Sequence, residues 1–435
     1  MPKRILLLLT LLLLSGWVAA CAQPTPTPIV APVPRTITLQ APAEPAVTPT
    51  PAQTPAQPAT EVPPTRTPPP EPEDIGIDPA SISLDDGELA ASWQAVFVPA
   101  TPFDNMHAPG PSGLPAHIQI LFDGVTDPRA REPGAPVIYI IPVDAYRQLW
   151  EAHDSRFVSD VIRRIADMSF QPPEPPPTRG LPVLPAEETF GVNDFATQLR
   201  PASSEATSAS KTGFRFVGRF AQDATPLTNE WLRYIYQGLT NDGRYLVAFF
   251  FPVRTDALPD AIEEVSQADQ DAFNQDGLGY LADKARTLDA LPSDAWEPDL
   301  AAFDALIASL AIEGMPETGL MQGSWLWVGQ RALGSDAPTP VLDPPAYEIA
   351  FGEGDVQVRA DCKRADGTYA ADGGMTGALS LTLNPTTMQI CSEDSQADAF
   401  LTALSQVDRF AIAPGAHTMQ LFLPDGSVMS FAQAE

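Results

Sequence analysis

Residues 22–74 cannot form a packed core, so the folded part of this 435-residue chain has to lie C-terminal to Asp74. The segment consists mainly of Pro, Thr, Ala and Gln and holds 17 of the protein's 49 prolines. Few of its side chains could be buried, and burial is what offsets the entropy lost when a chain becomes ordered. We predict a disordered tether over residues 21–74, with much polyproline II, and a globular region from residue 75 onwards. Its Thr-Pro repeats also fit O-glycosylation.

A short hydrophobic leader precedes the tether. Lys3 and Arg4 give a positive start, Ile5 to Leu14 is almost entirely apolar, and small residues then lead to Cys21. This pattern is typical of a secretory signal and is too short for a transmembrane helix. The cysteine resembles the lipobox of bacterial lipoproteins. The resemblance implies that residues 1–20 are a signal peptide and that Cys21 becomes an acylated (palmitate-bearing) N-terminus. The alternative is an ordinary signal peptide with a chance cysteine.

The charge balance excludes several classes of partner. The chain has 25 Lys and Arg against 55 Asp and Glu, and loss of Lys3 and Arg4 with the leader would take the formal net charge from −30 to −32. Nucleic acids and anionic lipid headgroups repel such a chain, so we expect no nucleic-acid partner. The acidic loops around Asp269 and Asp276 lack EF-hand spacing, and we expect neither a metal nor a cofactor.

Residues 75–315 are predicted to form an α+β domain. Strand-like runs occur at Leu89–Val98, His117–Phe122, Val137–Val143, Phe195–Leu199, Gly213–Phe220, Trp231–Gln237 and Tyr245–Val253. Apolar spacing predicts a helical stretch from Tyr146 to Ile165, another within Asp260–Leu288 and a third at Asp299–Ile312. Runs of strands followed by helices favour an antiparallel sheet covered by helices. The Asp242–Gly243 step favours a primed turn between two of the strands.

Residues 319–435 are predicted to form a second, small and mostly β domain with one helical stretch at Ala397–Val407. This unit resembles the META/HslJ-like domain of bacterial envelope proteins. The resemblance rests on Gly323 to Trp327, Pro345 to Phe351, Asp361 to Lys363, Gly367 to Tyr369, Thr386 to Cys391, the helix residues Phe400, Leu401 and Leu404, and the closing hairpin Leu421 to Phe431. It implies a fold and an envelope location and no catalytic mechanism. Lys363 and Asp361 stand where the family has Asn and Gly.

Cys362 and Cys391 are the two cysteines besides Cys21. Export would place them in an oxidising compartment, where a pair of cysteines is more often a disulfide than a metal site. The histidine nearest to them in sequence is His417, and two thiolates do not complete a tetrahedral zinc shell. Both cysteines lie within the segments that carry the family resemblance. We therefore predict a Cys362–Cys391 disulfide with no metal.

Recognisable catalytic motifs are missing from the sequence. It has four histidines and no His-Glu-x-x-His motif, nucleophile elbow or phosphate-binding loop. Adjacent carboxylates occur at Asp85 and Asp86, Glu187 and Glu188, and Glu263 and Glu264, and we interpret them as solvated surface. The aromatic rows on Tyr234 to Phe251 and at Trp325 and Trp327 favour buried core over a stacking platform for sugars or peptides.

The sequence therefore predicts a non-enzymatic lipoprotein held through Cys21 on the extracytoplasmic face of the cell membrane. Its role would be binding or envelope maintenance, with an unidentified envelope protein or extracellular ligand as partner. Two alternatives stay open. One is an extracytoplasmic hydrolase that uses surface carboxylates across a cleft. The other is a pilot-like assembly partner with an apolar groove lined by residues such as Trp325 and Phe422.

Overall fold

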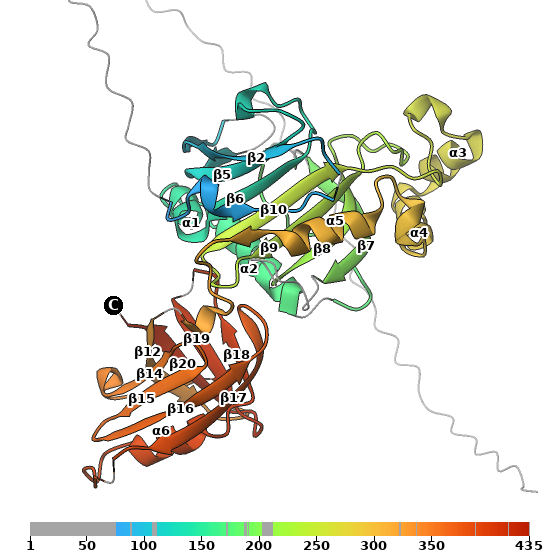
Figure 1. Ribbon diagram of the computed structural model, residues 1–435. Coiled ribbons are helices and arrows are strands. Elements are labelled where there is room, and N and C mark those ends of the chain that lie inside the picture. The colour runs from blue at the N-terminus through green and yellow to red at the C-terminus, as the bar shows by residue number, and fades with distance from the viewer. Residues whose placement is uncertain are drawn as a thin grey trace, which may run out of the picture. The chain divides into compact units, whose positions relative to one another are not determined.

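The computed structural model describes residues 75–434, except for residues 88, 107–110, 171–172, 187–188, 190, 202–211, 322, 336, 388 and 416. Its first domain is built around a seven-stranded sheet in the order β2-β5-β6-β10-β9-β8-β7, in which all neighbouring strands pair antiparallel (Figure 1). The strands are β2 (Trp93–Val98), β5 (His117–Phe122), β6 (Val137–Pro142), β7 (Val192–Pro201), β8 (Thr212–Ala221), β9 (Arg233–Leu239) and β10 (Tyr245–Pro252). The α+β architecture predicted for this part of the chain is confirmed.

Helices cover both faces of this sheet. They are α1 (Val143–Glu151), α2 (Phe157–Phe170), α3 (Gln267–Gln275), α4 (Gly277–Asp289) and α5 (Leu300–Ser309). Short strands β1 (Ile82–Ser83) and β11 (Ala311–Ile312) pair with each other, as do β3 (Thr101–Asp104) and β4 (Ser112–Leu114). Single 3₁₀ turns are η1 (Pro79–Ser81), η2 (Pro128–Ala130), η4 (Ile262–Glu264) and η5 (Ser293–Ala295).

The side chains of the central strands alternate between two cores. On one face Tyr234, Phe249 and Phe251 pack with Phe303 of α5, which crosses the sheet in Figure 1. On the other face Phe250 and its neighbours pack with the buried sides of α1 and α2. Each fully buried aromatic or aliphatic side chain stabilises the fold by about 1.5–3 kcal/mol. The aromatic rows of β9 and β10 are thus core, as predicted.

Two predicted helical stretches are each broken into two helices. The stretch from Tyr146 to Ile165 stops at Glu151 and restarts at Phe157. Asp154 between them has a left-handed backbone, with φ of 59°, which no helix accommodates. In the stretch Asp260–Leu288, α3 ends where the carboxylate of Asp276 accepts the N–H of Gly279 and caps α4.

The turn between β9 and β10 differs from the primed type predicted for it. Gly243 donates its N–H to the carbonyl of Thr240 at 2.8 Å, and Gly243 alone in this turn has a positive φ, of 73°. A primed turn would need a positive φ at the central residues as well. Instead, the Asp242 carboxylate accepts the Thr240 hydroxyl at 2.6 Å and the Arg244 N–H at 3.1 Å, which holds the loop as a type I turn followed by a glycine.

The second domain is a closed antiparallel barrel. Its strands are β12 (Ser324–Arg331), β14 (Tyr347–Phe351), β15 (Asp355–Ala360), β16 (Lys363–Ala371), β17 (Thr376–Pro385), β18 (Arg409–Ile412), β19 (Thr418–Phe422) and β20 (Val428–Gln433). Pairing of β20 with β12 closes the barrel, and β13 (Thr339–Pro340) adds to β12. The helix α6 (Ala397–Leu404) packs Phe400 and Leu404 into the barrel core, and η6 (Gly319–Met321) and η7 (Pro344–Ala346) are single turns.

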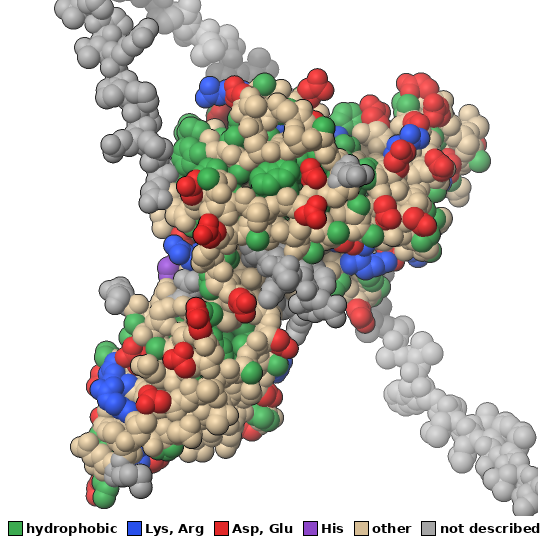
Figure 2. Space-filling model, in the orientation of Figure 1, with side chains coloured by type: hydrophobic (Ala, Val, Ile, Leu, Met, Phe, Trp, Pro, Cys, Tyr) green, Lys and Arg blue, Asp and Glu red, His purple; other side chains and the backbone are tan. Residues whose placement is uncertain are grey.

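The surface agrees with the interpretation of the acidic residues as solvated. Figure 2 shows Asp and Glu side chains scattered over the visible face rather than gathered in one acidic patch. Within the described part of the chain, no helix has the length and apolar character needed to cross a membrane.

Candidate functional site

The two cysteines of the second domain are brought together. Cys362 and Cys391 are joined by a disulfide bond, and their Cα atoms are 5.5 Å apart. Cys362 stands in the tight turn between β15 and β16, and Cys391 lies in the segment that joins β17 to α6. Cys21, the predicted lipidation residue, lies outside the described residues.

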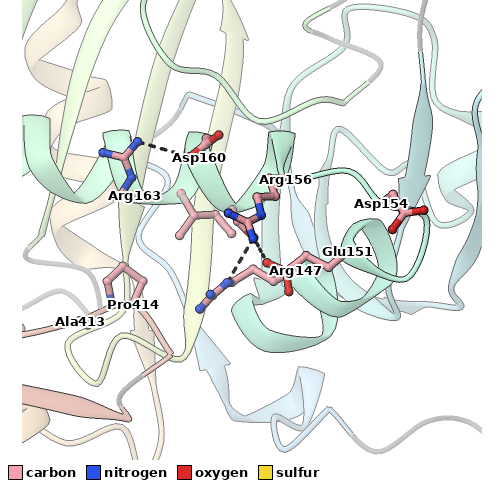
Figure 3. Close-up of a pocket in the computed structure, with 10 residues that line it drawn as sticks. Arg147, Glu151, Asp154, Arg156, Asp160, Arg163, Ala413 and Pro414 are labelled. Carbon is pink, nitrogen blue, oxygen red and sulfur yellow. Dashed lines mark hydrogen bonds and ion pairs between the residues drawn. The ribbon is translucent and has the colours of Figure 1, made fainter.

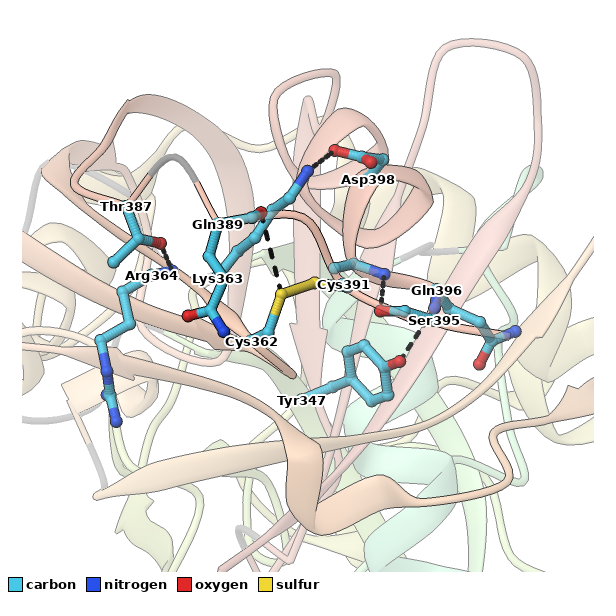
Figure 4. Close-up of a disulfide and its surroundings, with 11 residues drawn as sticks. Tyr347, Cys362, Lys363, Arg364, Thr387, Gln389, Cys391, Ser395, Gln396 and Asp398 are labelled. Carbon is cyan, nitrogen blue, oxygen red and sulfur yellow. Dashed lines mark hydrogen bonds and ion pairs between the residues drawn. A yellow bond between two sulfur atoms is a disulfide. The ribbon is translucent and has the colours of Figure 1, made fainter. Parts of the chain in front are cut away.

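The disulfide is one of several contacts that hold the segment before α6 on the barrel (Figure 4). The N–H of Arg364 donates to the hydroxyl of Thr387 at 2.8 Å. The N–H of Gln396 donates to the hydroxyl of Tyr347 at 2.9 Å, and this tyrosine is itself buried against Phe400 of α6. These contacts have a structural role, because each of them joins the segment before α6 to another residue of the same domain.

The turn that carries Cys362 shows how the chain accommodates its departures from the family pattern. Asp361 has a positive φ of 55°, a conformation that glycine adopts most easily and that Asp tolerates better than most residues. The ammonium group of Lys363, which replaces the usual Asn, forms an ion pair with Asp398 in the first turn of α6. In this chain the turn therefore has a positive φ at Asp361 and a polar contact from Lys363 to the helix.

The groove expected by the pilot-like hypothesis is not formed by the two residues named for it. Trp325 is completely buried, and its indole N–H donates to the carbonyl of Leu320 at 3.1 Å. Phe422 lies beneath the guanidinium of Arg409, whose central carbon is 5.2 Å from the ring centroid. Trp327 is also buried and stacks on Phe400. The two tryptophans fill the barrel instead of lining an open apolar channel.

A groove of about 700 Å³ lies along α1 and the first turns of α2 (Figure 3). Its lining consists of Arg147, Glu151, Asp154, Arg156, Ser159, Asp160, Ile162, Arg163, Ala413 and Pro414. The loop that contributes Pro414 is held by Gly415, which donates its N–H to the carbonyl of Gly243 at 2.9 Å, and by His417, whose Nε2 lies 2.6 Å from the Asp144 carboxylate. Pockets of this volume are typical of small-molecule sites.

Side chains from the two helices are linked across the groove floor. The hydroxyl of Ser159 donates to Glu151 at 2.5 Å and accepts from the Nε of Arg147 at 3.4 Å. Arg163 pairs with Asp160 at 3.3 Å and with Asp167 at 3.4 Å. The groove thus presents guanidinium groups and carboxylates side by side, a set suited to binding charged or hydroxylated groups.

Sequence reasoning missed this groove, although a signal was present. Arg156, Ser159, Asp160 and Arg163 stand at i, i+3, i+4 and i+7, which places them on one face of a helix opposite its buried stripe. The left-handed Asp154, which ends one helix and turns the next against it, could not be read from this pattern.

The carboxylate pairs named from the sequence do not gather in either described groove. Asp85 is exposed, as are Glu263 and Glu264 in η4. Glu187 and Glu188 lie outside the described residues. A smaller groove of about 440 Å³ on α3 and α4 contains Asp269, Asp276 and Asp283, but Lys284 binds Asp269 at 3.0 Å and Asp276 caps α4. Within the described residues, no group of three or more His, Cys, Asp or Glu is placed to hold a metal ion.

A family model matches the part of the chain that forms the barrel. Residues 320–435 match the model of the META domain family. A solved NMR structure of a protein from Burkholderia xenovorans aligns with 26% of this chain and 83% of its own chain, at 28% identity and a TM-score of 0.23. No curated protein matches the chain. The protein therefore combines a mixed α/β unit with a META domain at residues 320–435.

Proposed function

We propose that this protein is a lipid-anchored envelope protein that works on the extracytoplasmic face of the membrane and binds a ligand or partner without catalysing a reaction. Acyl chains on Cys21 would hold it at the membrane. The proline-rich residues 22–74 would then carry the folded domains away from the bilayer. A META domain at residues 320–435 is consistent with an envelope location.

The observation that carries the location is the geometry of Cys362 and Cys391. Their Cα separation of 5.5 Å suits a disulfide without backbone movement. Such bonds persist in exported proteins and are rare where the cytosol keeps thiols reduced. The disulfide geometry and the signal-like leader that precedes Cys21 are two different observations, and both support the same compartment.

The non-catalytic role is supported by how the groove carboxylates are used. The hydrolase alternative needs two carboxylates that face each other across a substrate. Of the three carboxylates in the larger groove, two are engaged with neighbouring side chains: Glu151 accepts from Ser159, and Asp160 pairs with Arg163. Groups arranged in this way favour recognition of a ligand over acid–base chemistry.

Metabolic labelling with an alkyne analogue of palmitate tests the anchor. The full-length protein is expected to incorporate the label and to sediment with membranes, whereas Cys21→Ala is expected to lose the label and to be released or left unprocessed. A double Cys362→Ala/Cys391→Ala variant is the matched control, since it removes two cysteines and should stay labelled. Undiminished labelling of Cys21→Ala would overturn the proposed anchor.

A second measurement tests export across the membrane separately from attachment of lipid to Cys21. In cells with the outer envelope opened, added protease should reach the folded domains of both the wild type and any processed Cys21→Ala protein. Export without lipid would favour the ordinary signal peptide. Protection from protease in both proteins would instead contradict the extracytoplasmic location.

A further inference from the structure

The groove on α1 and α2 contains guanidinium nitrogens that no described residue contacts by a hydrogen bond or ion pair. Among the described residues, no side chain lies within hydrogen-bond or ion-pair distance of the Arg156 guanidinium. Arg147 uses its Nε for Ser159, and its two terminal nitrogens have no partner there either. The chain has more than twice as many acidic as basic residues, so two arginines left unpaired in one concavity are available for a ligand.

The same groove contains three carboxylates beside its three arginines, and the partners of these carboxylates decide which donor groups stay open. Glu151 accepts from Ser159 at 2.5 Å, and Asp160 pairs with Arg163 at 3.3 Å. Figure 3 shows Asp154 on the side of the groove that carries Arg156 and Glu151, so a ligand there meets carboxylates as well as guanidinium groups. The donor groups that remain open to a ligand are the terminal nitrogens of Arg147 and the guanidinium of Arg156, and planar guanidinium forks match the two oxygens of a carboxylate or phosphate.

The volume of the groove and the net charge of the whole chain restrict the size and the charge of the ligand. The groove volume of about 700 Å³ fits a small molecule, and Ile162 and Pro414 give it apolar lining for an organic body. A net charge of −30 repels polyanions at long range, which disfavours nucleic acids and anionic polymers. A single organic acid meets the same arginines with far less repulsion.

We propose that this groove binds a small organic carboxylate through Arg147 and Arg156. The assignment rests on the binding role proposed for the protein and does not depend on the lipid anchor. Each guanidinium would donate two parallel N–H bonds to a carboxylate, while the body of the ligand would lie against Ile162 and Pro414.

Calorimetric titration of the full-length protein in detergent tests this assignment, with glutarate as the probe and its uncharged diamide, glutaramide, as the matched compound. Saturable binding of glutarate and none of glutaramide is expected. Arg156→Gln and Arg147→Gln should each weaken binding by about tenfold or more, since each removes a charge-assisted hydrogen bond. Arg129→Gln, an exposed arginine outside the groove, should bind as the wild type does.

A conservative variant of Arg156 distinguishes the contribution of the planar guanidinium group from the contribution of positive charge alone. Arg156→Lys keeps the charge and loses the fork, so it should bind glutarate more weakly than the wild type and more tightly than Arg156→Gln. Glutarate affinity that is unchanged in both Gln variants, or the absence of saturable binding, would overturn the proposal. Inorganic phosphate bound more tightly than glutarate at the same arginines would overturn the carboxylate assignment. None of these results bears on labelling of Cys21.

Discussion

The Cα atoms of Cys362 and Cys391 lie 5.5 Å apart although 29 positions separate them in the chain. Their bond joins the turn between β15 and β16 to the segment that leads into α6. The same segment is held by Thr387 and by the Tyr347 hydroxyl. A covalent link at this point restricts the helix that fills one part of the barrel core.

Removal of the disulfide should therefore destabilise the second domain. The Cys362→Ala/Cys391→Ala variant is expected to lose about 2–5 kcal/mol of unfolding free energy, mainly because the unfolded chain is no longer cross-linked. Hydrogen exchange should speed up in β14 to β16 and stay unchanged in β9 and β10 of the first domain. Thiol titration of the oxidised wild-type protein should find neither cysteine free. Two free thiols there would contradict the bond.

A buried ion pair at the edge of the first sheet is expected to matter more than the surface pairs. Arg219 binds Asp194 through two hydrogen bonds, of 3.1 and 2.6 Å, and its side chain is 2% exposed. Asp194→Ala should cost about 3–5 kcal/mol in denaturant unfolding, because it leaves a buried guanidinium without its counter-charge. Asp283→Ala breaks the exposed pair with Arg286 and should cost at most about 0.5 kcal/mol. Equal costs for the two variants would contradict this account.

His117 should make the stability of the first domain depend on pH. Its Nδ1–H donates to the carbonyl of Pro115 at 2.8 Å, its Nε2 faces the amide of Gln119 at 3.1 Å, and burial lowers the pKa of the imidazole. The unfolded chain, with a histidine pKa of about 6.5, then takes up the proton more readily than the folded one. The contribution of neutral His117 is therefore complete above a pH of about 6.5 and is lost as the pH falls below it.

Urea unfolding at about pH 7.5 and about pH 5.5 measures this effect. The wild-type protein should lose more free energy of unfolding between these two pH values than His117→Gln, by at most about 1.4 kcal/mol per pH unit. The difference between the two proteins isolates His117 from the many carboxylates that titrate at lower pH. Identical losses in both would show that the buried imidazole is not the source.

The elements with a strong local pattern could be predicted from the sequence. The run His117–Phe122 is β5, with the same two ends, and Asp299 caps α5 through the N–H of Ala301 at 2.9 Å. The aromatic residues of β9, Tyr234 and Tyr236, alternate with period two, whereas β10 has three consecutive aromatics, as a strand buried on both faces can. These features depend on residues close to one another in the chain.

Features that depend on single backbone conformations or on distant contacts could not be predicted. The left-handed Asp154 divides one apolar stripe into α1 and α2, and the groove exists because of that break. Burial of Trp325 depends on closure of the barrel by β12 and β20, which lie far apart in the chain. The pattern of neighbouring residues in the sequence predicts neither the left-handed backbone of Asp154 nor the burial of Trp325.

The most direct test of the account is the mass of the N-terminal peptide of the mature protein, isolated from membranes. We predict a peptide that begins at Cys21 and carries a mass increment corresponding to acyl lipid, with Lys3 and Arg4 removed along with the leader. A mature chain that begins at another residue, or that begins at Cys21 without added lipid, would contradict the claim that this is a membrane-anchored lipoprotein.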